Sequence, residues 1–318
     1  MLSFSFAAVA WCAVSDGMAQ GGGAGPEVWM MPPCLEGRSF RELFARPDEW
    51  REARSRVHVL GCTDLQTQKL FTDEELKAWF AQMSAWGLKF GMEVGAIKPW
   101  GKTGEQTFAA EKPMWERVQR LGGTIYAVAM DEPLVCCRQH IHESDAYAVR
   151  ETADYIARVR KSFPDVRIGD IEAYPSIAMT NHVWWIDALN KSLAERGVRG
   201  LDFYRLDVDW VAFNVREACG WREVRRIEQE CRKRKLPFSL IYWASGLPAM
   251  RKRGLADDST WYTGIMQQGY DYAFVDGAPD QVVIESWVQS PERCLPETAE
   301  FTFARSVRDF AAKFVKPK

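Results

Sequence analysis

The sequence predicts an α/β protein in which eight parallel strands close into a single (β/α)8 TIM barrel. Apolar, strand-like runs alternate along the chain with amphipathic helical stretches, a pattern typical of βαβ units. Eight such units can be counted, and 318 residues is an ordinary length for one barrel. No Gly-x-Gly-x-x-Gly loop follows an early strand, which argues against an open, doubly wound sheet.

The segment before the first strand predicts export. Leu2 to Val14 is apolar, and Gly17-Met18-Ala19 resembles a small-residue cleavage site. The apolar run is too short to cross a bilayer, so we expect no membrane span and a secreted or periplasmic protein. The predicted division of the chain is a signal peptide at 1–19, a flexible lead at 20–26 and a single catalytic barrel at 27–318.

Charge and cysteine content limit the possible partners. The formal net charge is −2, and a nucleic-acid partner would need a basic face, so none is expected. Export would permit disulfides. Cys34 and Cys62 each come just after a predicted strand, and these strands should be neighbours, so they are the best candidate pair. No Cys-x-x-Cys pair has zinc-site spacing, and we expect no cofactor.

The predicted strands are short apolar runs bounded by turn residues or Pro. They are Glu27–Met31, Arg56–Leu60, Leu88–Val94, Thr124–Met130, Val166–Glu172, Gly200–Val208, Pro237–Trp243 and Gln281–Trp287. The clearest helix begins at a capping box, Thr72 to Glu75, followed by an apolar face that includes Leu76 and Trp79. Further helices are predicted at 144–163, 181–196, 214–235 and 300–315.

The fourth predicted strand ends in an unusual group of residues. Six apolar or β-prone residues lead to Met130, and then Asp131 and Glu132 precede Pro133. Pro stops the strand, so two adjacent carboxylates stand at its carboxyl end. In a barrel of parallel strands, active sites are built at that end.

Period-two alternation predicts that other strands add polar groups to the same opening. Glu93 should point inward because its neighbours on the opposite face are apolar. The other side chains that we expect to converge there are Asp170, Glu172 and Tyr174 of the fifth strand, Arg205, Asp207 and Asp209 of the sixth, and Glu285 and Trp287 of the eighth. Trp243 ends the seventh strand, and a flat indole beside acids suits the C–H face of a sugar ring.

Asp131-Glu132-Pro133 resembles the Asn-Glu-Pro that ends strand four in the largest clan of barrel glycoside hydrolases. The resemblance implies that Glu132 is the general acid/base. Two features depart from the clan's pattern. Asp131 stands where Asn commonly contacts the sugar 2-hydroxyl, and the clan's nucleophile Glu at the end of strand seven has no counterpart, because no Asp or Glu lies between Glu230 and Asp257.

Hydrolysis of a glycosidic bond needs a protonated acid and an ionised carboxylate. The second carboxylate must come from Asp170 or Glu172, Asp207 or Asp209, or Glu285. We expect Glu132 as the acid and Asp207 or Asp209 as base or nucleophile, acting on a poly- or oligosaccharide. The residues expected to bind the sugar are Glu93, Asp131, Asp170, Glu172, Tyr174, Arg205, Trp243, Glu285 and Trp287.

Two other functions remain open. A barrel that binds glycan without cleaving it would explain the missing acid of strand seven. A metal-dependent isomerase or phosphoesterase would also gather acids at strand ends, but it would normally add His ligands. The four His are His58, His140, His142 and His182, and only His140 and His142 alternate like a ligand pair. The sequence predicts no metal ligands and leaves the oligomeric state undetermined.

Overall fold

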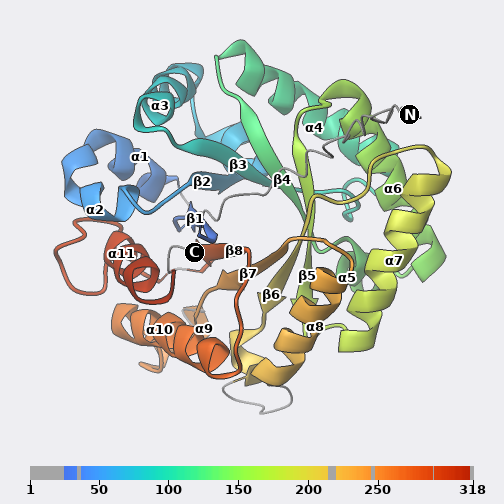
Figure 1. Ribbon diagram of the computed structural model, residues 1–318. Coiled ribbons are helices and arrows are strands. Elements are labelled where there is room, and N and C mark those ends of the chain that lie inside the picture. Colours follow the sequence, from blue (N-terminus) through green and yellow to red (C-terminus); the bar gives the residue numbers. More distant parts are fainter. Residues whose placement is uncertain (1–24, 34–36, 214–219, 245–247, 289, 316–318) are drawn as a thin grey trace, which may run out of the picture.

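The computed structural model describes residues 25–33, 37–213, 220–244, 248–288 and 290–315. Within them, eight strands pair in parallel in chain order, and β8 pairs back with β1. Figure 1 shows the strands at the centre of the molecule and the helices around them. The predicted closed (β/α)8 barrel is confirmed. The predicted signal peptide at 1–19 lies outside the described residues, as does the predicted lead up to residue 24.

The strands lie close to their predicted positions, although the second and the sixth each begin three residues later than predicted. They are β1 Glu27–Met31, β2 Val59–Thr63, β3 Lys89–Val94, β4 Ile125–Asp131, β5 Arg167–Tyr174, β6 Phe203–Val208, β7 Phe238–Tyr242 and β8 Gln281–Glu285. The second strand begins three residues later than predicted, because Arg56 and Val57 bond back to carbonyls of the preceding helical turn. Cys62 therefore lies within β2, and its predicted partner Cys34 lies outside the described residues.

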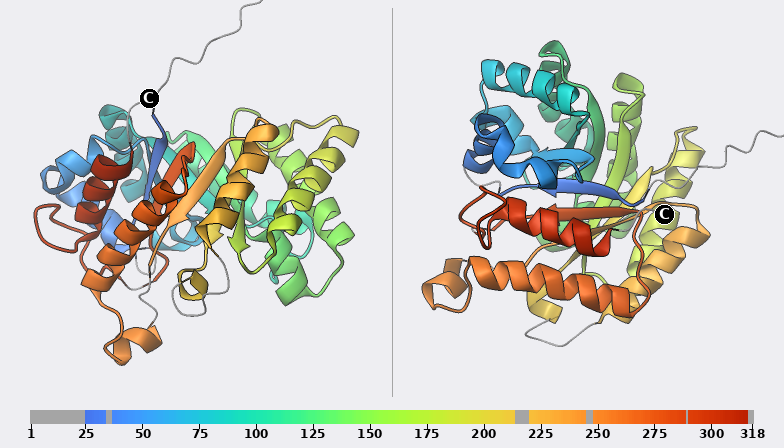
Figure 2. Two further views of the ribbon diagram at one scale, coloured as in Figure 1. Left: turned by 60° about the horizontal axis from the view of Figure 1, so that its bottom comes forward. Right: turned by 60° about the vertical axis from the view of Figure 1, so that its left-hand side comes forward.

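The helices follow the predicted alternation. They are α1 Arg38–Ala45, α2 Arg51–Arg54, α3 Asp73–Trp86, α4 Gly104–Arg120, α5 Pro133–Cys136, α6 Asp145–Ser162, α7 Met179–Glu195, α8 Trp221–Lys233, α9 Pro248–Lys252, α10 Asp258–Phe274 and α11 Phe303–Phe314. The predicted capping box at α3 is present, with Thr72 and Glu75 each accepting the other's backbone N–H. Figure 2 shows α10 and α11 lying beside the strands. No described helix is long and apolar enough to cross a membrane.

The interior of the barrel is filled below its opening. Trp29 and Arg205 are fully buried there, with the guanidinium carbon 4.3 Å from the centroid of the Trp29 ring. Glycines make room for large side chains here, since a Cβ at Gly91 would lie 2.3 Å from the ring of Trp29 and one at Gly169 would lie 1.9 Å from the ring of Phe203. The barrel interior is thus a packed core.

Candidate active site

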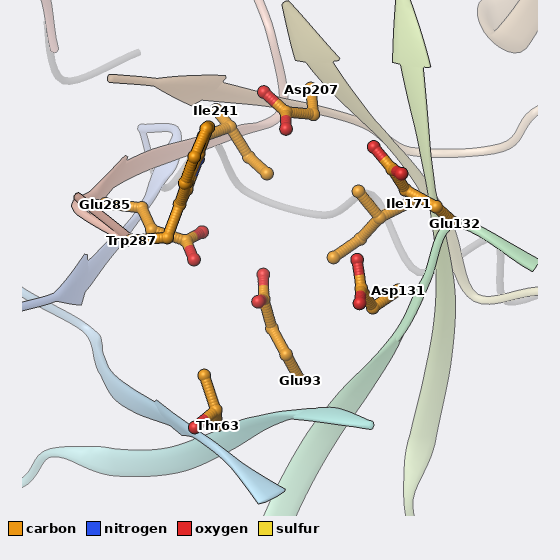
Figure 3. Close-up of a pocket in the computed structure, with 9 residues that line it drawn as sticks. All are labelled: Thr63, Glu93, Asp131, Glu132, Ile171, Asp207, Ile241, Glu285 and Trp287. Carbon is orange, nitrogen blue, oxygen red and sulfur yellow. The ribbon is translucent and has the colours of Figure 1, made fainter. Parts of the chain in front are cut away.

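A cavity of about 350 Å³ opens at the carboxyl ends of the strands. It is built by strands far apart in the sequence, because parallel strands of a closed barrel end at one rim. Five of its nine lining residues are carboxylic acids and none is basic. Figure 3 shows the lining, which is Thr63, Glu93, Asp131, Glu132, Ile171, Asp207, Ile241, Glu285 and Trp287.

Asp131 and Glu132 both line this cavity, although adjacent strand residues normally point to opposite faces. Asp131 is the last residue of β4, and Glu132 adopts the left-handed conformation with φ 51° and ψ 51°. Pro133 then begins α5. A non-glycine residue in this region costs about 1–2 kcal/mol, and such strain clusters at functional sites. The turn is what brings two consecutive carboxylates into one cavity.

Hydrogen bonds from β5 hold this turn in place. The backbone N–H of Glu132 donates to the carbonyl of Ile171 over 3.0 Å. The buried carboxylate of Glu172 accepts the N–H groups of Leu134 and Val135 over 2.6 and 3.1 Å. These are otherwise unpaired donors at the start of α5. Glu172 therefore positions the turn that carries Glu132.

The surroundings of Glu132 favour its protonated form. Burial and the negative charges of Asp131 and Asp209 raise the pKa of Glu132 to about 7, and the positive charge of Lys98 opposes them. Lys98 lies 2.5 Å from the carboxylate of Asp131 in an ion pair. A carboxyl group with a pKa near 7 can hold a proton for a leaving group at neutral pH.

Asp207 of β6 lies on the same side of the cavity as Glu132 (Figure 3). Burial and the charge of Glu132 hold the pKa of Asp207 well above its ordinary value. The indole N–H of Trp243 donates to Oδ1 of Asp207 at a distance of 2.6 Å. This hydrogen bond lowers the pKa of Asp207 and so opposes the other two effects. Since like charges resist ionising together, the pair of carboxyls retains a proton.

Glu93 and Glu285 form the opposite wall, and their carboxyl groups point toward each other (Figure 3). Burial and the charges of Glu285 and Asp131 hold the pKa of Glu93 well above its ordinary value. Burial also raises the pKa of Glu285 to about 7, opposed by the charge of Arg205 and a hydrogen bond with Glu93. Trp287, which is 39% exposed, completes this wall.

Three predicted sugar-binding residues do not reach the cavity. Asp170, Glu172 and Tyr174 face the surrounding helices, so their expected convergence at the opening is wrong. Asp170 accepts the indole N–H of Trp185 in α7 over 2.7 Å, Glu172 caps α5, and the Tyr174 hydroxyl bonds to Glu223 of α8. These three residues share one face of β5, as predicted. The face that lines the cavity carries Ile171 instead.

The remaining predicted residues lie around or below the cavity. Asp209 follows β6, and its Oδ1 accepts the N–H groups of Val211 and Ala212 over 2.8 and 3.1 Å. Arg205 is fully buried and donates to Ser239, so it lies beneath the acids. Trp243 is 3% exposed and supports Asp207 and Trp287, with its ring centroid 4.4 Å from that of Trp287.

Several lining residues escaped the sequence-based prediction. Ile171 and Ile241 line the cavity from β5 and β7, and Thr63 does so because β2 runs beyond its predicted end. A second cavity of about 250 Å³ shares Thr63, Glu93 and Asp131 with the first. Its other lining residues are Asp64, Val94, Gly95, Lys98 and Trp100. The opening therefore extends from Trp287 toward Trp100.

None of the described His residues lines either cavity. His182 is buried, and its ring bonds to the hydroxyl of Tyr204 over 2.7 Å. His58 accepts the backbone N–H of Val28. Within the described parts of the chain, no three His, Cys, Asp or Glu side chains are grouped so that they could hold a metal ion.

No family model matches the sequence, and no curated protein does. Solved structures share the fold. A GH39 β-xylosidase from Caulobacter crescentus is 13% identical, with a TM-score of 0.54 over 91% of this chain and 73% of that chain. Xylanase10C from Cellvibrio japonicus, solved with xylopentaose, is 10% identical, with a TM-score of 0.56 over 93% of this chain and 68% of that one. The Ignisphaera aggregans GH53 catalytic domain is 10% identical, with a TM-score of 0.55 and coverage of 88% and 94%. At such identities, the likeness establishes the barrel fold alone.

Proposed function

We propose that this barrel hydrolyses O-glycosidic bonds of a poly- or oligosaccharide, with Glu132 as general acid and Asp207 as its partner. The observation that carries the proposal is that Glu132 and Asp207 come from separate strands and line one cavity, where each carboxyl has a raised pKa. The charge of Glu132 contributes to the raised pKa of Asp207. Such a pair holds the proton that a leaving oxygen needs. Asp207 then serves as base or nucleophile once ionised, a form that the Trp243 hydrogen bond favours.

The rest of the cavity supports a sugar as the ligand. Trp287 offers an exposed indole face beside carboxyl groups, a combination that suits the apolar and hydroxylated faces of a pyranose. Solved barrels similar to this chain include a β-xylosidase and a xylanase that holds xylopentaose. The adjoining cavity beside Trp100 offers room for a further sugar unit.

Asp207 replaces the strand-seven acid that the Asn-Glu-Pro clan would use. β7 ends at Tyr242 and presents Ile241 to the cavity, so the partner of Glu132 must come from a neighbouring strand. Asp207 of β6 lines the cavity, whereas the Oδ1 atom of Asp209 is occupied by backbone N–H groups. We therefore place Asp207 ahead of Asp209.

A panel of polysaccharides and aryl glycosides, assayed for reducing sugar and released phenol, tests the proposal. Once a substrate is found, Glu132→Gln and Asp207→Asn should each lower kcat by about 100- to 10,000-fold. Asp209→Asn is the matched control and should retain most activity. An equal loss in Asp209→Asn would overturn the choice of Asp207, and full activity of Glu132→Gln would overturn the assignment of the acid. Glycan binding without any product would instead show a binding protein.

We also propose that the protein is exported, on the basis of its apolar first residues and the small residues before Gln20. Expression of the full chain in a Gram-negative host, followed by N-terminal sequencing of the periplasmic fraction, tests this. A mature protein that begins at Gln20 is the expected result. Intact protein confined to the cytoplasm would contradict it.

A further inference from the structure

One wall of the cavity has more negative groups than its surroundings neutralise. The lining contains five carboxylic acids and no basic residue. Lys98 is paired with Asp131 at 2.5 Å in the adjoining cavity, which leaves four acids of the lining without an ion pair among the described residues. Buried carboxylates without a countercharge are costly, so their concentration at one opening points to a ligand that offsets the cost.

Glu285 and Glu93 carry the clearest sign of this. The Glu285 side chain is only 4% exposed, and its Oε2 atom has no hydrogen-bond partner. Oε1 of Glu93 is also buried without one, and both carboxyl groups point into the cavity (Figure 3). In a folded protein, such buried acceptors are normally satisfied. Two unsatisfied carboxylate oxygens that face a cavity therefore call for a donor from the ligand.

Arg205 does not meet this need. It lies beneath both acids and lowers the pKa of Glu285 through its charge, but its side chain is fully buried and its Nε donates to Ser239 over 3.0 Å. The groups that face Glu285 are Glu93 of β3, Asp131 of β4, and Arg205 and Asp207 of β6. One cation therefore faces Glu285 among three other acids. Burial and neighbouring acids raise the pKa of both Glu93 and Glu285, so a cation bound beside them would favour their ionised form.

Trp287 identifies the kind of cation. Its indole is 39% exposed and lies at the rim beside Glu285. An ammonium group binds an aromatic face and donates three hydrogen bonds to oxygen atoms. A wall made of one indole and two carboxyl groups matches a sugar-borne ammonium, whereas a neutral hydroxyl offers only one donor.

We infer that the Glu93, Glu285 and Trp287 wall binds the ammonium group of an amino sugar, so that the substrate is a glycan with free amino groups. This inference rests on the proposed glycosidase function, because it names the class of substrate that the same cavity would bind. Glu132 and Asp207 would act on the glycosidic bond, and the opposite wall would select the charged sugar.

Three β-1,4-linked tetrasaccharides that differ only at C2 test the inference, namely those of glucosamine, N-acetylglucosamine and glucose. Binding is measured by calorimetry to Glu132→Gln, in which hydrolysis should not consume the probe. The glucosamine tetramer should bind about tenfold or more tighter than the other two, since hydrogen bonds to charged groups exceed neutral ones. The preference should shrink as salt is added.

Variants of the wall make the test specific. In the Glu132→Gln background, Glu285→Gln and Glu93→Gln should each reduce the preference for the glucosamine tetramer over the glucose tetramer by about tenfold. The control Glu195→Gln removes an exposed carboxylate at the carboxyl end of α7, away from the opening, and should retain the full preference. Thermal melts establish that each variant is folded. The comparison of the three tetrasaccharides needs only the Glu132→Gln variant, so it stands even if a wall variant fails to fold.

The outcomes separate this inference from the proposed function. Equal affinity for all three tetramers would overturn the amino-sugar preference while leaving hydrolysis intact. Tighter binding of Mg²⁺ or Ca²⁺, with displacement of the glucosamine tetramer, would show a metal site and overturn it as well. Selective binding of the glucosamine tetramer without hydrolysis of any probe by the natural protein would support the inference and contradict the proposed function.

Discussion

Trp243 donates a hydrogen bond from its indole nitrogen to Oδ1 of Asp207 over 2.6 Å. β7 has no acid at its end, yet through Trp243 it orients a carboxyl group that belongs to β6. The same ring packs on Trp287 at a centroid distance of 4.4 Å. Trp243 thus links the proposed catalytic pair to the sugar-facing wall while being almost completely buried itself.

Replacing Trp243 by Phe tests this link. The change keeps an aromatic ring but removes the N–H donor that favours ionised Asp207, so the pKa of Asp207 should rise further. If Asp207 must be ionised, the acidic limb of the pH profile should move to higher pH. The profile of kcat against pH measures this shift.

Trp185→Phe is a matched control. Trp185 donates the same kind of bond to buried Asp170, over 2.7 Å, on the helix-facing side of β5. Its replacement should lower thermal stability and leave the pH profile unchanged. A profile that moves equally in both variants would mean that the Trp243 bond has only a structural role.

The alkaline limb of the pH profile should depend on Glu132, whose pKa is about 7. An acid must be protonated, so activity should fall as pH rises through this value. Lys98→Met removes a cation that lowers the pKa of Glu132 and should shift the limb to higher pH. Asp131→Asn removes a charge that raises this pKa and should shift the limb to lower pH. If the alkaline limb moved in the same direction in both variants, the result would contradict the assignment of Glu132 as the acid.

Glu172 should affect catalysis without touching the substrate. Its carboxylate holds the N–H groups of Leu134 and Val135 just after Glu132, so Glu172→Leu should let the turn relax and lower kcat by about 10- to 100-fold. KM should change little because Glu172 faces the helices. Glu172→Gln keeps an acceptor oxygen and should recover much of kcat. Loss of stability with unchanged kcat would limit Glu172 to a structural role.

Gly169→Ala should destabilise the barrel below the site. An added Cβ would lie 1.9 Å from the buried ring of Phe203, and overpacking of this kind costs about 1–3 kcal/mol. Gly220→Ala is the control, because a Cβ there meets nothing within 4 Å and Gly220 has an extended φ of −155°. Chemical denaturation measures both. Equal stability of the two variants would show that the barrel interior is less tightly packed than described.

Local sequence predicted the end of β4 well. Asp131 and Glu132 line the cavity because a proline after a buried strand determines where the strand stops, and this information lies within a few residues. The period-two pattern did not predict the local role of Asp209, whose Oδ1 accepts N–H groups of the backbone turn that follows it. Asp and its neighbouring N–H groups form such turns readily, which an alternation pattern does not register.

The alternation of β5 predicted which residues share a face but assigned the wrong face to the interior. Asp170 and Glu172 are fully buried against helices, where an indole N–H and two backbone N–H groups satisfy them. Polarity is a poor guide here, because both faces of a barrel strand are buried. A buried carboxylate is acceptable wherever donors are available.

By itself, the sequence determined that eight strands alternate with helices and that a carboxyl pair ends the fourth strand, because periodicity, capping and proline act over short stretches of chain. Alternation within strands also predicted that Glu93, Asp207 and Glu285 meet Glu132 at one opening, where they line one cavity. Only the tertiary structure decided that Asp170 and Glu172 support this cavity from outside. The physical reason is closure of the sheet. Which side chains meet depends on the register between strands and on the donors that the surrounding helices supply, and neither is encoded within a single strand.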